Sequence, residues 1–179
     1  MKRRRRRFGK SQGSESKAKQ YAKEACWPEA ARERLTWSHC ATSCVTMPLM
    51  YVLKVRSHQR EELVEFTDEV RIKLKESGAK EGIVVLYVQH TTAGLTVNEN
   101  ADPDVPRDLL HALRTLIPQH GMGFRHGEEN SDAHIKASLV GSSVTVPFKD
   151  GELLLGRWQG IFLCEFDGGR ERRVIMMIR

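Results

Sequence analysis

The feature that most constrains this fold is a short apolar run, GIVVLYVQH, at residues 82–90. The run is rich in β-branched and aromatic residues, which favour β-strands, and it is too short to cross a bilayer. A continuous run of this kind is typical of a central strand that is covered on both faces. We therefore expect the rest of the chain to build a sheet around it.

The segments on either side predict an α+β fold. Apolar residues alternate over 50–58, which indicates a half-buried strand. Helical spacing predicts one helix over 60–78, a second over 102–118 and one or two further turns over 130–141. After residue 142 the pattern predicts an antiparallel meander with a tight turn at Asp150-Gly151. Residues 47–179 should thus form a single compact domain, mostly antiparallel sheet with two principal helices.

Basic residues are concentrated in the first 46 residues, which carry 12 Lys and Arg against 4 Glu, a net charge of +8. Residues 47–179 carry 17 against 19, a net charge of −2. The Arg block, Gly and Ser favour a disordered extension that precedes the domain. It is interpreted as solvated, with nucleic-acid binding or a nuclear address as the alternatives. Because no secretory signal or apolar span is present, we expect a cytoplasmic protein without a membrane partner.

Three of the seven histidines lie in polar, loop-like segments beside carboxylates: His90, His126 and His134. Three neutral imidazoles that leave one position open are typical of a catalytic zinc or a related divalent ion. Glu99, Glu128 and Asp132 are candidate further ligands, or residues that orient the histidines. The spacing matches no local motif such as HExxH, so the alternative is that each histidine only forms hydrogen bonds in its loop.

The segment HTTAG, residues 90–94, offers the hydroxyls of Thr91 and Thr92 near a glycine, groups that can hold a phosphate. It lacks the Gly-Lys-Ser/Thr ending of a P-loop, and an ordinary strand-to-turn transition is the alternative. The following NENADPD, residues 98–104, either organises a metal or a cationic substrate, or initiates the next helix. This stretch therefore predicts a polar wall without fixing its ligand.

Two further pairs of residues are candidates for the same site. Ser142 and Ser143 lack the surroundings of a nucleophilic serine and are interpreted as polar contacts. Lys136 and Arg157 supply positive charge for a phosphate, unless each belongs to a solvated face. None of the four is diagnostic when taken alone.

Three segments in this order and at this spacing point to a known family: QHTTAGLTVNENADPDVPRDL, NSDAHIKASLVGSS and GRWQGIFLCEFDGGRERRV. In this combination the chain closely resembles the YjbQ-like family, also called the secondary thiamine-phosphate synthase family. The resemblance covers about residues 50–178 and does not extend over the basic extension. It implies a compact α+β domain that assembles as a homotrimer and holds a metal ion between histidines.

The resemblance also implies where the site residues lie. The metal, a zinc or magnesium ion, is expected at His90, His126 and His134. We assign catalysis to Glu99, Asp102 and Lys136. We assign substrate binding to Thr91, Thr92, Asn100, Ser142, Ser143, Arg157 and Gln159. The individual roles are our inference from residue chemistry.

The family name implies the joining of hydroxymethylpyrimidine diphosphate to thiazole phosphate, with release of pyrophosphate. A divalent metal with Lys136 or Arg157 would stabilise the departing diphosphate. Magnesium prefers oxygen ligands and three histidines suit zinc, so the metal is left open. We thus expect a metal-dependent enzyme acting on a small phosphorylated substrate, most specifically a thiamine-phosphate synthase-like transferase. The alternatives are metal-assisted phosphate-ester hydrolysis, with Glu99 or Asp102 as base, and a non-catalytic trimeric module that binds a metal or ligand.

Overall fold

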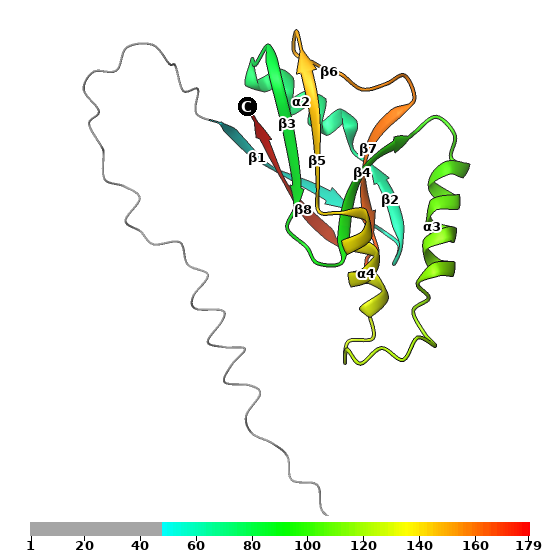
Figure 1. Cartoon of the computed structure of the whole chain (residues 1–179). Helices are drawn as coiled ribbons and strands as arrows, with labels where there is room; N and C mark the ends of the chain where they lie inside the picture. The colour runs from blue at the N-terminus through cyan, green and yellow to red at the C-terminus, as the bar shows by residue number, and fades with distance from the viewer. Residues whose placement is uncertain (1–47) are drawn as a thin grey trace, which may run out of the picture. The chain divides into compact units, whose positions relative to one another are not determined.

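The computed structural model describes residues 48–179, so the predictions for residues 1–46 lie outside the described part of the chain. The described residues form an α+β domain whose strand pairs are all antiparallel, which confirms the predicted fold class (Figure 1). Within these residues, no helix combines the length and the apolar character that crossing a membrane requires. The cytoplasmic location stays a prediction.

The apolar run becomes the middle strand of a five-stranded sheet. The sheet follows the order β1 (Leu49–Arg56), β8 (Glu171–Ile178), β3 (Glu81–Val88), β5 (Ser143–Lys149) and β6 (Glu152–Leu153). The prediction that β3 is covered on both faces is wrong for a single chain. Val84 and Leu86 are fully buried, whereas Ile83 is 39% exposed and Tyr87 is 47% exposed. One face of this sheet is therefore open in the described chain.

The second sheet has three strands, in the order β2 (Glu62–Glu65), β7 (Gln159–Glu165) and β4 (Ala93–Glu99). The predicted turn is confirmed, since Asp150 and Gly151 both have the positive φ that a tight hairpin needs, 55° and 78°. The single C-terminal meander is wrong, because β7 pairs in this sheet while β8 returns to the other. The last strands thus join the two sheets.

Over residues 48–179 three helices accompany the sheets: α2 (Thr67–Ser77), α3 (Asp104–Leu116) and α4 (Ser131–Val140). The prediction of one continuous helix over 60–78 is wrong at its start, where residues form β2 instead. Leu63 pairs with Cys164 of β7, and this pairing between distant segments overrides the local helical spacing. The helix ends as expected at Gly78, which has a φ of 69°.

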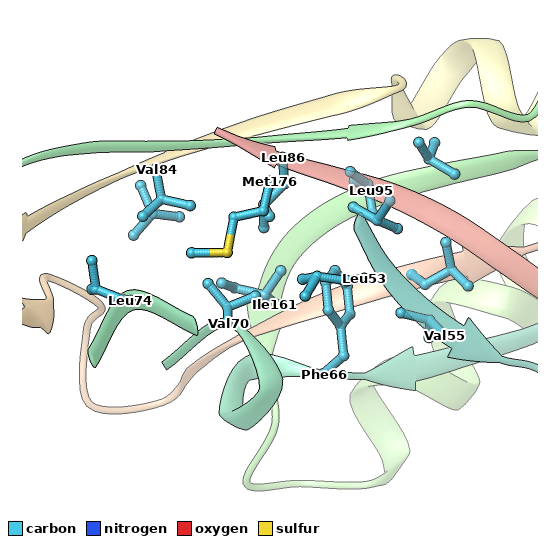
Figure 2. Close-up of a cluster of buried hydrophobic side chains, with 14 of the residues drawn as sticks. Leu53, Val55, Phe66, Val70, Leu74, Val84, Leu86, Leu95, Ile161 and Met176 are labelled. Atoms are coloured by element: carbon cyan, nitrogen blue, oxygen red, sulfur yellow. The ribbon is translucent and has the colours of Figure 1, made fainter. Parts of the chain in front are cut away.

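The main core lies between the two sheets. Leu53 and Met176 come from the five-stranded sheet, Leu95 and Ile161 come from the other sheet, and Val70 of α2 packs with them (Figure 2). A second cluster joins the other side of the three-stranded sheet to α3 and α4; it contains Leu113, Ala133, Ala137, Cys164 and Phe166. Strand β7 is therefore covered on both faces, and burial raises the pKa of the Cys164 thiol to about 12.

Candidate functional site

A cavity of about 720 Å³ lies between the end of β3 and the helix α4. Its polar lining consists of Gln89, His90, Thr91, His134, Ser138 and Ser142. Tyr87 stands at its edge, and small apolar residues complete the wall. Two of the three predicted metal-binding histidines thus share one cavity with two predicted substrate-binding residues.

His90 is positioned by the end of the β3–β8 ladder. The last paired residues are Val88 and Val174, and the N–H of Gln89 then donates to the carbonyl of Arg173 at 3.3 Å. The N–H of Arg173 donates in turn to Nε2 of His90 at 3.0 Å. The imidazole therefore takes the place of a backbone acceptor, and its neutral form carries the proton on Nδ1.

The surroundings of His90 favour this neutral form. Burial lowers the pKa of His90 below its ordinary value of 6.5, and the charge of Arg172 lowers it further. Arg173 and Arg170 act in the same direction, while Glu165 opposes them. His90 thus presents the Nδ1–H of a neutral imidazole as a hydrogen-bond donor.

Close contact between β4 and α4 brings His134 to the same cavity. The N–H of Leu95 donates to the carbonyl of Gly141 at 2.9 Å, just beyond the end of α4. A Cβ atom on Gly94 would meet that carbonyl oxygen and the Cγ1 atom of Val140, both at 2.9 Å. Only glycine leaves room for this approach, so Gly94 sets the position of the helix that carries His134.

His126, the third predicted ligand, lies beside His134 but not with His90. The ring of His126 contacts that of His134 edge-on, with centroids 5.4 Å apart, but His126 does not line the cavity. Nε2 of His90 is already occupied by the N–H of Arg173. Within residues 48–179, no group of three His, Cys, Asp or Glu side chains is arranged to hold a metal ion. Metal binding therefore stays a prediction, and the described residues of a single chain offer no three-ligand site for it.

Thr92 does not line the cavity and instead belongs to a buried hydrogen-bond network. Its hydroxyl accepts a hydrogen bond of 3.0 Å from the buried guanidinium of Arg172. Arg172 also binds the fully buried Glu165, with 2.6 Å between Nε and Oε2, and Ser57 donates to the same carboxylate. Burial opposes ionisation of Glu165, yet the bonds from Arg172 and from the N–H of Asp167 hold its pKa below the ordinary value. This buried network lies close enough to His90 for the charges of Arg172 and Glu165 to act on the pKa of the imidazole.

Lys136 lies away from the cavity, contrary to its expected place beside the histidines. It is 1% exposed, and its Nζ atom donates to Asp132 at 2.8 Å and to Glu61 at 2.5 Å. Positions two apart on a helix face different sides, so Lys136 cannot share the direction of His134. Asp132, a candidate further ligand, is committed to the same ion pair and to Arg60.

The remaining predicted residues gather at the opposite end of β4. Glu99 pairs with Gln159, and the N–H of Asn100 donates to the carbonyl of Trp158. Arg157 stacks over the exposed ring of Trp158 at 4.5 Å. At about 3.3 Å per residue, the length of β4 separates this end from His90 by roughly 20 Å. One chain therefore holds the predicted site in two separate halves.

Two other predicted residues have local roles in the structure. Asp102 accepts a hydrogen bond of 2.9 Å from the N–H of Asp104, which fits the alternative that this segment initiates α3. Ser143 begins β5 opposite Tyr87 and is not part of the cavity lining. Sequence reasoning missed Arg60, Glu61 and Arg114, although the i,i+4 spacing of Asp132 and Lys136 signals an ion pair on one helix face.

The family profile described as "UPF0047 protein YjbQ-like" matches residues 51–179. The chain belongs to this YjbQ-like UPF0047 family. Among its YjbQ-like relatives, the UPF0047 protein MJ1081 of Methanocaldococcus jannaschii is 49% identical over 75% of this chain and 96% of its own length. The UPF0047 protein YugU of Bacillus subtilis is 44% identical, over 69% and 94% respectively.

Solved structures of YjbQ-like proteins have the same fold. A family member from Clostridium acetobutylicum is 44% identical, with a TM-score of 0.69 over 72% of this chain and 99% of that chain. A protein from Sulfolobus solfataricus is 31% identical, with a TM-score of 0.70 over 74% of this chain and 96% of that chain. The latter is described as a YbjQ-like protein of unknown function.

These comparisons correct the predicted function. The family and these relatives carry only the UPF0047 or YjbQ-like description, and the Sulfolobus protein is described as of unknown function. Neither a thiamine-phosphate synthase nor a metal-dependent enzyme is indicated by them. The thiamine-phosphate synthase prediction is therefore wrong on these findings, whereas the predicted family is confirmed.

Proposed function

We propose that the cavity between His90 and His134 binds a small molecule through a phosphate or carboxylate group. The lining supplies imidazole, hydroxyl and amide groups and, among the described residues, includes no carboxylate. Such a lining accepts an oxyanion without like-charge repulsion and without a metal ion. That the protein also converts the bound molecule, as an enzyme, stays a prediction.

The hydrogen bond from Arg173 to His90 carries this proposal, because it leaves the Nδ1–H of a cavity-lining imidazole as a donor. Arg172, Arg173 and Arg170 all disfavour a proton on His90, and Glu165 alone opposes them in that balance. Burial is the largest cause of the lowered pKa, and Arg172 and Arg170 are paired with Glu165 and Asp167, so the arginine charges add a secondary preference for an anion. Since Nε2 of His90 accepts from Arg173, its Nδ1–H is the group that donates to the anion.

The size of the cavity agrees with a small organic ligand. A volume of about 720 Å³ falls in the range of small-molecule sites, which usually combine an apolar wall with a few polar groups. Tyr87, Val88 and Ala137 supply the apolar part of this wall. The proposed ligand therefore carries an apolar or heterocyclic body behind its oxyanion.

A titration with phenyl phosphate, followed by the ring signals of the histidines in NMR spectra, tests this site. Spectra of His90→Leu and His134→Leu assign the two signals. We expect saturable shifts of His90 and His134, and no shift of His111, which lies on the exposed surface of α3. Shifts confined to other histidines, or a complete lack of saturation, would refute the proposal.

We also propose that copies of the chain associate, as a homotrimer, through the open face of the five-stranded sheet. Met50, Val52, Ile83 and Tyr87 are exposed on this sheet by 61%, 49%, 39% and 47%. Register places Val52 opposite Ile175, which is itself opposite Tyr87, so the apolar side chains form a continuous band. Exposed apolar bands of this kind mark association surfaces.

Association of chains would also bring the two separate halves of the predicted site together. Gln89 and His90 follow β3, so the cavity adjoins the edge of the open face, where Tyr87 belongs to both. The exposed Trp158 and Arg157 lie at the far end of β4 and have free surface to offer a neighbouring copy. A cavity completed by the Trp158 end of a second chain is the arrangement that we propose.

A further inference from the structure

A second cavity, of about 380 Å³, lies on another face of α4. It is lined by Gln59, Arg60, Glu61, Arg114, Gln119 and Lys136. None of these residues lines the cavity of His90 and His134. A ligand in this cavity would therefore occupy a site distinct from the one in the proposed function.

The base of this cavity is a buried ion cluster. Lys136 is 1% exposed and binds Asp132 and Glu61, which are 0% and 7% exposed. Arg60 binds the other oxygen of Asp132 at 2.9 Å. Burial opposes ionisation of Asp132, but the hydrogen bonds from Arg60 and Lys136 hold its pKa below the ordinary value. Asp132 is thus held in its charged form, and both carboxylates already accept hydrogen bonds from cationic side chains.

The cations of this cluster outnumber its carboxylates. Arg60, Lys136 and Arg114 contribute three positive charges against the two negative charges of Glu61 and Asp132. The charge of the nearby Asp167 also acts on Arg60, but Asp167 pairs with Arg170 at 3.3 Å, so this pair adds one charge of each sign. One positive charge therefore remains uncompensated beside a cavity that is open to small ligands.

Arg114 is the hydrogen-bond donor best placed to bind an anion at this cluster. Its Nε atom binds Glu61, and its two terminal nitrogens have no hydrogen-bond acceptor among the residues that the structure describes. Its side chain is 50% exposed, so these nitrogens can meet a ligand that enters from solvent. Both oxygens of Glu61 are covered, one by Lys136 and one by Arg114, so an entering anion meets guanidinium groups first.

We propose that this cavity is a second binding site for an oxyanion, a phosphate or a carboxylate group, held by Arg114 and Arg60 above Lys136. Guanidinium groups bind both kinds of oxyanion through paired, charge-assisted hydrogen bonds. The buried cluster fixes Arg60 before the ligand arrives, which reduces the entropy lost on binding. This proposal is independent of the His90–His134 cavity.

The test uses the full chain, titrated with inorganic phosphate and, in parallel, with succinate. The Nε–Hε signals of the arginines in NMR spectra report the site directly. We expect saturable shifts of Arg114 and Arg60; the anion with the lower dissociation constant identifies the class of ligand. No saturable shift of either arginine with either anion would overturn the proposal.

Arg114→Gln is the decisive variant, because Arg114 is half exposed, whereas loss of Lys136 would remove the buried one of the two cations that Glu61 and Asp132 share. Arg107→Gln is the matched control: it lies on the same helix, is exposed, and pairs with Asp104. We expect Arg114→Gln to weaken binding about tenfold and Arg107→Gln to leave it unchanged. Equal affinity in wild type and Arg114→Gln, or an equal loss in both variants, would contradict the site.

A third variant separates this site from the His90–His134 cavity. His90→Leu should leave the shifts of Arg114 and Arg60 unchanged, because His90 does not line the second cavity. A loss of these shifts in His90→Leu would merge the two sites and overturn the inference. Failure of phenyl phosphate to bind at His90, with intact binding at Arg114, would instead overturn only the proposed function.

Discussion

The backbone N–H of Arg173 donates a hydrogen bond of 3.0 Å to Nε2 of His90, so a side chain closes the β3–β8 ladder. This bond joins the fold to the candidate site, because the strand pairing orients the imidazole. It also determines which ring nitrogen faces a ligand as a donor. The same bond competes with any metal ion at Nε2.

The lowered pKa of His90 predicts a pH dependence of stability. The folded-state pKa lies below the ordinary 6.5, so the unfolded chain binds more protons between these two values. The free energy of unfolding should therefore fall as the pH is lowered through 6.5 towards the folded-state pKa. Urea unfolding at several pH values measures this, and His90→Leu should reduce the slope. An unchanged slope in that variant would assign the effect to other groups.

Loss of Arg172 should destabilise the domain strongly. Arg172→Met leaves Glu165 charged, fully buried and without its cation, which should cost about 3–5 kcal/mol in the free energy of unfolding. Arg173→Met is the control at the next position, where the side chain is exposed, and should change stability by no more than about 0.5 kcal/mol. Urea unfolding measures both variants, and equal losses in the free energy of unfolding would contradict this prediction.

Gly94→Ala should both destabilise the domain and disturb the cavity. The added methyl group would meet the carbonyl oxygen of Gly141 and Val140 at 2.9 Å, an overpacking that should cost about 1–3 kcal/mol. Because α4 carries His134, affinity for phenyl phosphate should fall as well. Gly127→Ala, where nothing lies within 4 Å, should change neither property. Thermal unfolding and calorimetric titration measure the two effects, and a neutral Gly94→Ala would contradict the proposed packing.

Tyr87→Lys should dissociate the proposed trimer, because it places a charge in the open apolar band. Ile72→Lys is the control, since Ile72 is a comparably exposed apolar residue on α2, with 55% exposure. Sedimentation velocity should give three times the chain mass for wild type and Ile72→Lys, and less for Tyr87→Lys. A monomeric wild type, or a trimer that Tyr87→Lys leaves intact, would contradict this assembly.

Local sequence signals predicted most of the elements but not how they pair. The Asp150-Gly151 turn and the apolar run of β3 follow from local conformational preference, and both are confirmed. Strand β2 was not predicted, because Leu63 continues the helical spacing of α2. This segment forms a strand by pairing with β7, where Leu63 lies opposite Cys164. Pairing between residues so far apart in sequence leaves no local pattern to read.

The site was predictable only where side-chain direction follows from local structure. His90 and His134 line one cavity, whereas Lys136, two positions from His134 on α4, faces another side of the helix. The distance between Glu99 and His90 follows from the length of β4, whose bounds were not predictable. Contacts such as Arg114 with Glu61 depend on the packing of α3, which no short motif specifies.

The affinity of phenyl phosphate for three chains, measured by calorimetry, tests the central claim most directly: wild type, His90→Leu and His111→Leu. His111 is an exposed histidine of α3 outside the cavity, so its variant controls for the loss of an imidazole. We predict binding in wild type and His111→Leu, and binding weakened about tenfold in His90→Leu. Equal affinity in all three chains would contradict a ligand site at His90.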